Sequence, residues 1–121
     1  MDSRGLRLLL EARRLVAESW CYGADARDAD GTEVDPWAVG AVSWSLLGAM
    51  VAALEQQAAA EGELPLDELA AALYALADLI ETDSLADWND DPRQTQESVL
   101  AMLDRAAAAY ESHALVLLSS N

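Results

Sequence analysis

One segment of the chain combines an aromatic side chain with polar groups that can act in catalysis or in binding. It reads Trp88-Asn89-Asp90-Asp91-Pro92-Arg93-Gln94-Thr95. At the mouth of an aromatic pocket, Asp90 can act as an acid or base and Asn89 as a hydrogen-bond donor. The same residue types also cap helices and turns, and Arg93 can pair with Asp90 or with a carbonyl. We favour this structural interpretation, in which the segment anchors the following helix and Trp88 packs into the core.

Tryptophan is abundant for a chain of this length, with four residues among 121. Each indole N–H needs a hydrogen-bond partner when it is buried, and several indoles can line one hollow. Combining the tryptophans with the polar segment gives our candidate ligand-binding set: Trp88, Asn89, Asp90, Arg93, Thr95, Trp44 and Trp20. Catalytic residues stay unassigned, with Asp90 and Asn89 as the candidates.

The single histidine and the single cysteine offer little further chemistry. His113 follows Glu111 and Ser112 near the end of the last predicted helix, where an exposed or partly packed side chain is the simpler explanation. Cys21 cannot form an intramolecular disulfide, and no basic neighbour in sequence lowers its pKa, so we expect a buried, inert thiol. We expect no cofactor.

An acidic loop over 24–34 raises the question of calcium. With Gly31 at the sixth position of an EF-hand loop, Ala26 and Trp37 occupy the first and twelfth positions. Calcium requires carboxylates at both of these positions, so the match fails. We expect a solvated acidic loop and no metal site.

The charge balance restricts the partners. The chain carries 22 acidic and seven basic residues, for a net charge of −15. Such a surface repels phosphate backbones and anionic membranes, so we expect neither nucleic-acid nor membrane binding. The apolar run at 6–10 is interrupted by Arg7 and followed by Glu11, which does not resemble a secretory signal, and we expect a cytoplasmic location.

Apolar residues at helical spacing predict four main helices, over about 3–20, 36–60, 66–81 and 96–117, with a short turn or helix at 84–88. Thr95 is the predicted N-cap of the last helix. The residues expected to face the core are Leu6, Leu9, Leu10, Val16, Ala17 and Trp20 in the first helix, Leu66, Leu69, Ala70, Leu73, Ala77 and Ile80 in the third, and Val99, Leu103, Ala106, Tyr110, Ala114 and Leu117 in the last.

The second predicted helix has no charge from Pro36 to Leu54, and Asp35-Pro36 is a typical helix start. At 1.5 Å per residue this stretch is about 28 Å long, close to the thickness of a bilayer. Its Ala, Gly and Ser content and the lack of Lys or Arg flanks argue against a membrane span. The amphipathic helices also need an apolar surface to pack on, so we expect a buried central helix.

A stripe of small residues on this central helix, formed by Ala41, Ser45, Gly48 and Ala52, indicates a tight helix crossing. The same stripe would allow a homodimer. The whole chain, 1–121, is then a single domain with an all-α fold, a compact bundle of four main helices and one short one.

The segment from Ser84 to Leu100 resembles the signature of a family of short bacterial and phage proteins, domain of unknown function 6197: Trp-Asn-Asp, a short linker, and then Thr and Val opening the last helix. Trp20-Cys21-Tyr22-Gly23 and Gly48-Ala49 are similar to weaker family motifs in the same order. The family often has a Cys before the Gly-Ala pair, where this chain has Ser45, so no role of that thiol carries over. The resemblance implies a helical fold and no assigned activity.

Three hypotheses for the function remain. The first is a non-catalytic protein that binds a partner protein or a small molecule, with residues 88–95 near the site. The second is a small enzyme of acid–base or cyclisation type that uses Asp90 and Asn89 in a tryptophan-lined pocket, so the sequence leaves open whether the protein is an enzyme. The third is an acidic decoy for a basic, nucleic-acid-binding partner.

Overall fold

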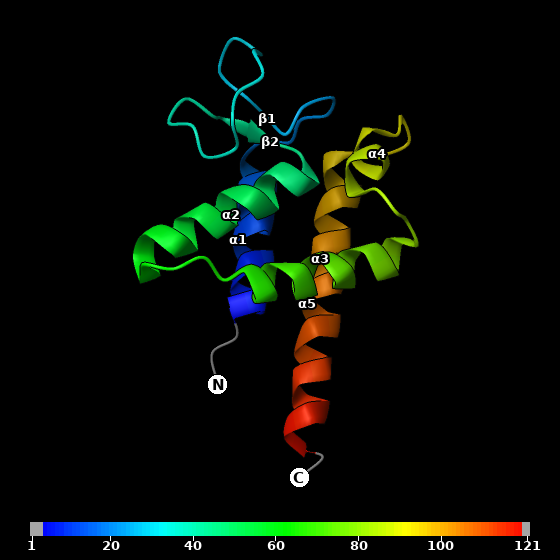
Figure 1. Cartoon of the computed structure of the whole chain (residues 1–121). Coiled ribbons are helices and arrows are strands. Elements are labelled where there is room, and N and C mark those ends of the chain that lie inside the picture. The colour runs from blue at the N-terminus through cyan, green and yellow to red at the C-terminus, as the bar shows by residue number, and fades with distance from the viewer. Residues whose placement is uncertain (1–3, 120–121) are drawn as a thin grey trace.

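The computed structural model describes residues 4–119, with side chains described as far as residue 112 (Figure 1). Its elements, in chain order, are α1 (Arg4–Glu18), β1 (Ala26–Arg27), β2 (Ser43–Trp44), α2 (Leu46–Glu61), α3 (Leu66–Ile80), α4 (Leu85–Asp90) and α5 (Gln96–Ser119). Four long helices and a short one therefore confirm the all-α prediction. The short antiparallel pair β1–β2 is an addition that the sequence did not predict.

Helix α1 is the element around which the others pack, because it contacts α2, α3 and α5. In Figure 1, α2 crosses in front of α1 and α3 crosses in front of α5, which runs beside α1. The strands and the loops between α1 and α2 gather at one end of the molecule. The last turns of α5 extend beyond the other helices at the opposite end.

The core of the bundle has contributions from four helices. On α1, the buried residues Leu8, Ala12 and Leu15 form a stripe at helical spacing. On α5, the predicted positions Val99, Leu103 and Ala106 are all buried. Helix α2 is buried over its first half, as the prediction of a buried central helix requires.

The buried face was predicted wrongly for parts of α1 and α3. Leu10 is 49% exposed and Ala17 is exposed, because neighbours on three sides of α1 select the face that contains Leu8 and Leu15. On α3, Leu66 is 57% exposed and Ala70 is exposed, since this helix lies at the surface and packs mainly against α1 and α5. The predicted core positions Ala114 and Leu117 lie outside the described side chains.

Helix α2 begins at Leu46, ten residues later than the sequence predicted. Residues 36–42 form turns instead, with the Ala38 N–H bonded to Asp35 O and the Ala41 N–H to Ala38 O. Gly40 and the β-branched residues Val39 and Val42 have low helix propensity and disfavour a helix over this stretch. The following residues, 43–44, pair with β1 and thereby satisfy backbone groups that a helix would otherwise use.

No helix among the described residues has the length and hydropathy needed to cross a membrane.

Gly48 permits a close contact between α2 and the loop after α1. A Cβ atom on Gly48 would lie 1.8 Å from Asp25 O, and the Ser45 N–H donates to this same carbonyl at 3.0 Å. The small residues predicted to mark a helix crossing therefore accommodate a loop backbone.

This contact predicts a large effect of Gly48→Ala. The added methyl group must displace backbone atoms, so we expect a loss of about 3 kcal/mol in the free energy of unfolding, measured by urea denaturation. Gly40→Ala is the matched control, since its nearest atom would be 4.0 Å away and its effect should stay below about 0.5 kcal/mol. Equal stability of the two variants would contradict the close approach.

Candidate functional site

Asn89 lies on the short helix α4 and is completely buried. Ser84 is the N-cap of α4, and its Oγ accepts a hydrogen bond from the Asp87 N–H at 3.1 Å. This short helix places the Asn89 side chain between the end of α1 and the start of α2. A polar side chain at such a position requires hydrogen-bond partners for all its groups.

All four hydrogen-bonding positions of the Asn89 amide are in use. Its Oδ1 accepts from Trp20 Nε1 at 2.8 Å and from the Leu46 N–H at 3.0 Å. Its Nδ2 donates to Cys21 O at 3.2 Å and to Asp90 Oδ1 at 3.1 Å. An asparagine has two acceptor and two donor positions, so nothing is left for a ligand.

We call this arrangement the Asn89 network; its members are Trp20, Cys21, Gly23, Leu46, Asn89 and Asp90. Its main effect is on α2, because Leu46 is the first residue of that helix and its N–H has no intrahelical partner. Asn89 therefore caps α2 from a distant part of the chain, while Ser45 Oγ accepts from the Gly48 N–H at 3.0 Å. The two caps together fix where α2 begins.

Asp90 extends the network to the loop after α1. Its Oδ1 accepts from the Gly23 N–H at 2.8 Å as well as from Asn89. The side chain is exposed and borders a hollow of about 250 Å³. This hollow is lined by Gly23, Ala24, Asp25, Glu33, Ser45, Ala86 and Asp90. None of these described lining residues is a tryptophan.

The remaining polar residues of the segment act locally. Arg93 pairs with Asp91, with Nη2 to Oδ2 at 2.9 Å, and the expected pairing with Asp90 or a carbonyl is absent from the contacts of the described side chains. Hydrogen bonds from the Arg93 side chain and backbone lower the pKa of Asp91 to about 2. Thr95 Oγ1 accepts from the Ser98 N–H at 3.1 Å, and Ser98 Oγ accepts from the Thr95 N–H, which confirms the predicted cap of α5.

The four tryptophans do not share one hollow. Trp88 is partly buried against the core, and Trp20 bonds to Asn89 and lies 5.8 Å from Tyr22, centroid to centroid. Trp44 is buried, with Nε1 donating to Pro36 O at 3.0 Å. Hydrogen bonds of Trp20, Trp44 and Asn89 thus connect separate elements of the fold.

Trp37 was not among the candidate residues because the sequence placed it inside a buried helix. It is 55% exposed and lies beside a groove of about 390 Å³ between the 36–38 turn and α2. The groove is lined by Pro36, Trp37, Ala38, Trp44, Ala52, Glu55, Gln56 and Ala59. The sequence did contain one signal: the charge-free run, 36–54, is longer than the buried part of α2, which lies within residues 46–54.

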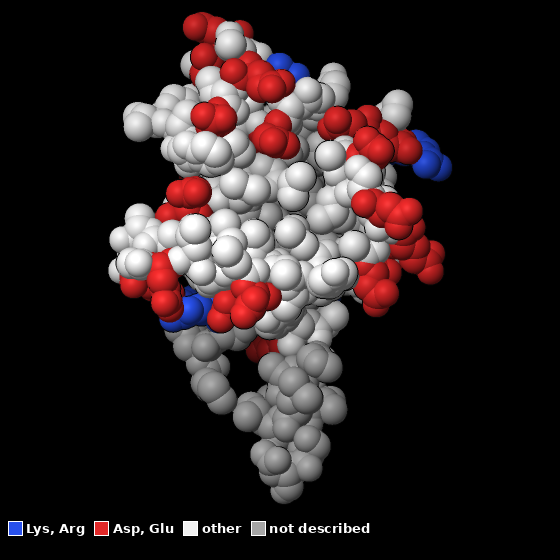
Figure 2. Space-filling model, viewed as in Figure 1, with Lys and Arg blue, Asp and Glu red and all other residues white. Residues whose placement is uncertain are grey.

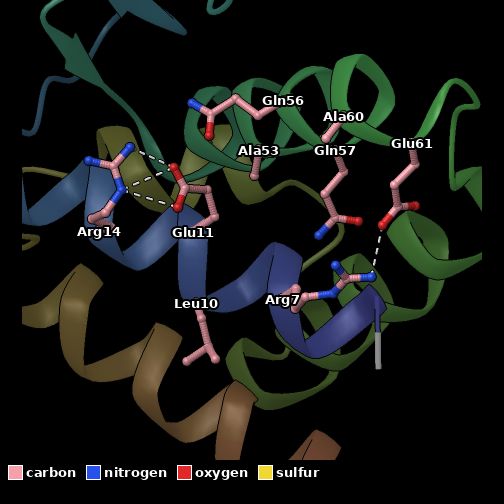
Figure 3. Close-up of a pocket in the computed structure, with 9 residues that line it drawn as sticks. All are labelled: Arg7, Leu10, Glu11, Arg14, Ala53, Gln56, Gln57, Ala60 and Glu61. Carbon is pink, nitrogen blue, oxygen red and sulfur yellow. Dashed lines mark hydrogen bonds and ion pairs between the residues drawn. The ribbon is translucent and has the colours of Figure 1, made fainter. Parts of the chain in front are cut away.

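A second groove, of about 380 Å³, lies between α1 and α2 (Figure 3). Its arginines already have acidic partners: Arg7 Nη2 lies 2.9 Å from Glu61 Oε1, and Arg14 Nη2 lies 2.6 Å from Glu11 Oε1. These pairs reduce the charge that the groove offers to a ligand.

Metal and thiol chemistry find no support in the described part of the chain. No group of three or more His, Cys, Asp or Glu side chains there is placed to hold a metal ion. Cys21 is buried as expected, and burial raises the pKa of its thiol, partly offset by the Ser43 hydroxyl and by Arg27. The His113 side chain lies outside the described residues.

Fold and site together define a small helical protein in which a Trp-Asn-Asp segment joins α4 to α1 and α2. The chain belongs to the family of unknown function DUF6197, whose model matches residues 2–109. The family resemblance seen in the sequence is therefore confirmed. Neither the curated proteins nor the solved structures compared with it gave a match.

The Asn89 network predicts a large loss of stability for Asn89→Ala. This change leaves the Leu46 N–H, the Trp20 indole N–H and Cys21 O without a partner, so we expect a loss of about 4 kcal/mol in thermal or urea unfolding. Asp90→Asn keeps an oxygen at the Oδ1 position and should cost less than about 1 kcal/mol. A small effect of Asn89→Ala would show that water replaces the amide.

The Asp91–Arg93 pair predicts a pH-dependent contribution to stability. The folded pKa of Asp91, about 2, lies below its ordinary value of 3.8. The stabilisation is therefore fully present above pH 3.8 and is lost as the pH falls through about 2. An NMR titration of the Asp91 carboxyl should show this midpoint, and Arg93→Gln should move it toward 3.8. An unchanged midpoint in the variant would contradict the assigned cause.

Proposed function

We propose that the protein is a non-catalytic binding protein that engages a partner protein through the surface around Trp37. We define this surface, the Trp37 surface, as the exposed residues Trp37, Val39 and Val42 together with the adjoining groove on α2. The observation that carries the proposal is the exposure of Trp37, Val39 and Val42, the three large apolar side chains of the loop 36–42 that reach the surface of a strongly acidic chain.

The three large apolar side chains that this loop exposes lie close together along the chain, within residues 37–42. Trp37 is 55% exposed, Val39 is 105% exposed and Val42 is 47% exposed. Large apolar side chains that gather on a surface mark interaction sites. Tryptophan is also among the residues that contribute most to protein–protein binding energy.

The loop is held in place before any partner arrives. Trp44 Nε1 donates to Pro36 O at 3.0 Å, and the Val42 N–H donates to Arg27 O at 2.9 Å. A surface that is already ordered loses less conformational entropy on binding, which favours affinity.

The Asn89 network supports this surface indirectly. Trp44, which forms one wall of the groove, exchanges backbone hydrogen bonds with the residues after α1: its N–H donates to Ser19 O, and its C=O accepts from the Cys21 N–H. Asn89 binds Cys21 O and the Leu46 N–H on either side of this contact. Under the proposal, residues 88–95 position the binding surface and do not touch the partner.

The enzyme hypothesis has less support from the geometry. The amide of Asn89 has no free hydrogen-bonding position, and Asp90 Oδ1 already accepts two hydrogen bonds. The hollow beside Asp90 is polar and has no aromatic wall among its described residues.

The proposal is tested by selecting peptide ligands from a displayed random library and measuring their affinities for variants. Trp37→Ala should weaken the selected peptides at least tenfold, because it removes the largest side chain of the surface. Tyr74→Ala is the matched control, since Tyr74 is an aromatic residue on α3 that is 77% exposed. The Tyr74→Ala variant should bind the selected peptides with the same affinity as the unmodified protein.

Nitrogen–proton NMR spectra locate the same binding site independently. The bound peptide should shift the amide signals of residues 37–39 and 52–59 most strongly. Peptides that bind Trp37→Ala normally, or shifts that map onto α3, would contradict the proposal.

A further inference from the structure

We infer that the Trp37 surface recognises a basic–apolar segment of its partner, in which an arginine or lysine side chain enters the groove beside Trp37. This inference rests on the proposed function and adds the chemistry of the partner. Three observations support it: the residues that line the groove, the charges around the groove, and the repulsion that a second copy of this chain would meet there.

The groove combines an aromatic wall with a carboxylate and a floor of small residues. Trp37 and Trp44 come from the loop side, and Ala52 and Ala59 from α2 leave room between them. Glu55 is exposed and lines the same groove. An indole face attracts cations, and a nearby carboxylate adds a direct ion pair.

Acidic residues predominate around the groove, and the arginines of the neighbouring groove, which shares Gln56, are paired with Glu61 and Glu11. No basic residue occurs in the sequence between Arg27 and Arg93, a stretch that includes the loop, α2, α3 and α4. Glu33 and Asp35 are exposed just before the apolar loop. The Arg27 guanidinium donates to Gly31 O at 2.9 Å and Tyr22 O at 3.0 Å, so it binds the backbone of its own loop.

Carboxylates also outnumber bases on the face of the molecule shown in Figure 2, including the end where the loops lie. A positively charged partner segment is attracted to such a surface at long range, and its apolar side chains are then buried against the loop. Such a segment would contact both the acidic groove and the exposed apolar side chains of the loop.

A second copy of this chain fits the surface poorly. Two copies joined through this face would bring Glu33, Asp35 and Glu55 of each copy close to those of the other, and facing like charges cost binding energy. The homodimer that the sequence allowed is therefore not the occupant we propose.

Arginine suits the groove better than a compact cation. Its planar guanidinium can stack on Trp37 while it pairs with Glu55, and its alkyl stem can lie along Ala52 and Ala59. The apolar neighbours of this arginine in the partner would cover Val39 and Val42.

The test uses a synthetic peptide of alternating leucine and arginine, with two counterparts in which glutamine or glutamate replaces arginine. The readout is the indole N–H signal of Trp37, identified as the signal that Trp37→Phe removes. The arginine peptide should shift this signal saturably and bind at least ten times more tightly than the glutamine peptide at low salt. The glutamate peptide should not bind, and added salt should reduce the difference between the first two.

Two charge variants separate the groove from the overall negative charge. Glu55→Gln should reduce the preference for arginine over glutamine about fivefold. Asp78→Asn removes one exposed charge from α3 and should leave the preference unchanged. If both variants reduce the preference equally, the arginine peptide follows the net charge of −15 and the inference is overturned.

The remaining outcomes distinguish this inference from the proposed function. If arginine and glutamine peptides bind equally at Trp37, binding through the surface stands and the cationic preference is overturned. If neither the arginine nor the glutamine peptide shifts the Trp37 signal but library-selected peptides do, the proposed function again stands and the cationic preference is overturned. If no peptide of either kind shifts Trp37, both the inference and the proposed function are overturned.

Discussion

The buried amide of Asn89 is the interaction on which the arrangement of the loop end depends. It satisfies backbone and side-chain groups from the end of α1, the loop after it and the first turn of α2. A buried polar group that uses all its hydrogen bonds confers specificity as well as stability, because any shift of one partner leaves another unsatisfied. One side chain that belongs to neither helix thus links the end of α1 to the start of α2, in addition to the direct packing between the two helices.

The same constraint explains why an apolar part of the chain lies at the surface. With the start of α2 fixed at Leu46 and residues 43–44 paired with β1, the preceding residues 36–42 cannot continue that helix. Pro36 stays buried and Ala41 packs against the core, but Trp37, Val39 and Val42 are left exposed. An unbroken charge-free stretch thus divides into two parts: a buried helix that stabilises the fold and an exposed loop that is available to a partner.

Local signals in the sequence predicted much of the fold. Helical spacing gave four main helices and a short one, and Thr95 was identified as a cap from its residue type and its place before the last helix; its partner, Ser98, is only three residues away. The start of α2 could not be predicted in this way, since Asp35-Pro36 and Ser45 are both adequate helix starts locally and the choice depends on distant contacts. The partners of Asn89 at Trp20, Leu46 and Cys21 are 43 to 69 residues away, and no spacing pattern links them. The exposure of Trp37 follows from that choice.

The distant origin of the α2 cap also affects the order in which the chain can fold during synthesis. Residues 4–61 contain α1, both strands and α2, yet their junction lacks an essential hydrogen-bond partner until Asn89 has left the ribosome. Contacts between residues so far apart in sequence form late, because the loop between them must close first. A nascent chain that ends before α4 would therefore leave the first turn of α2 without its distant cap, and this turn would stay frayed until the short helix docks.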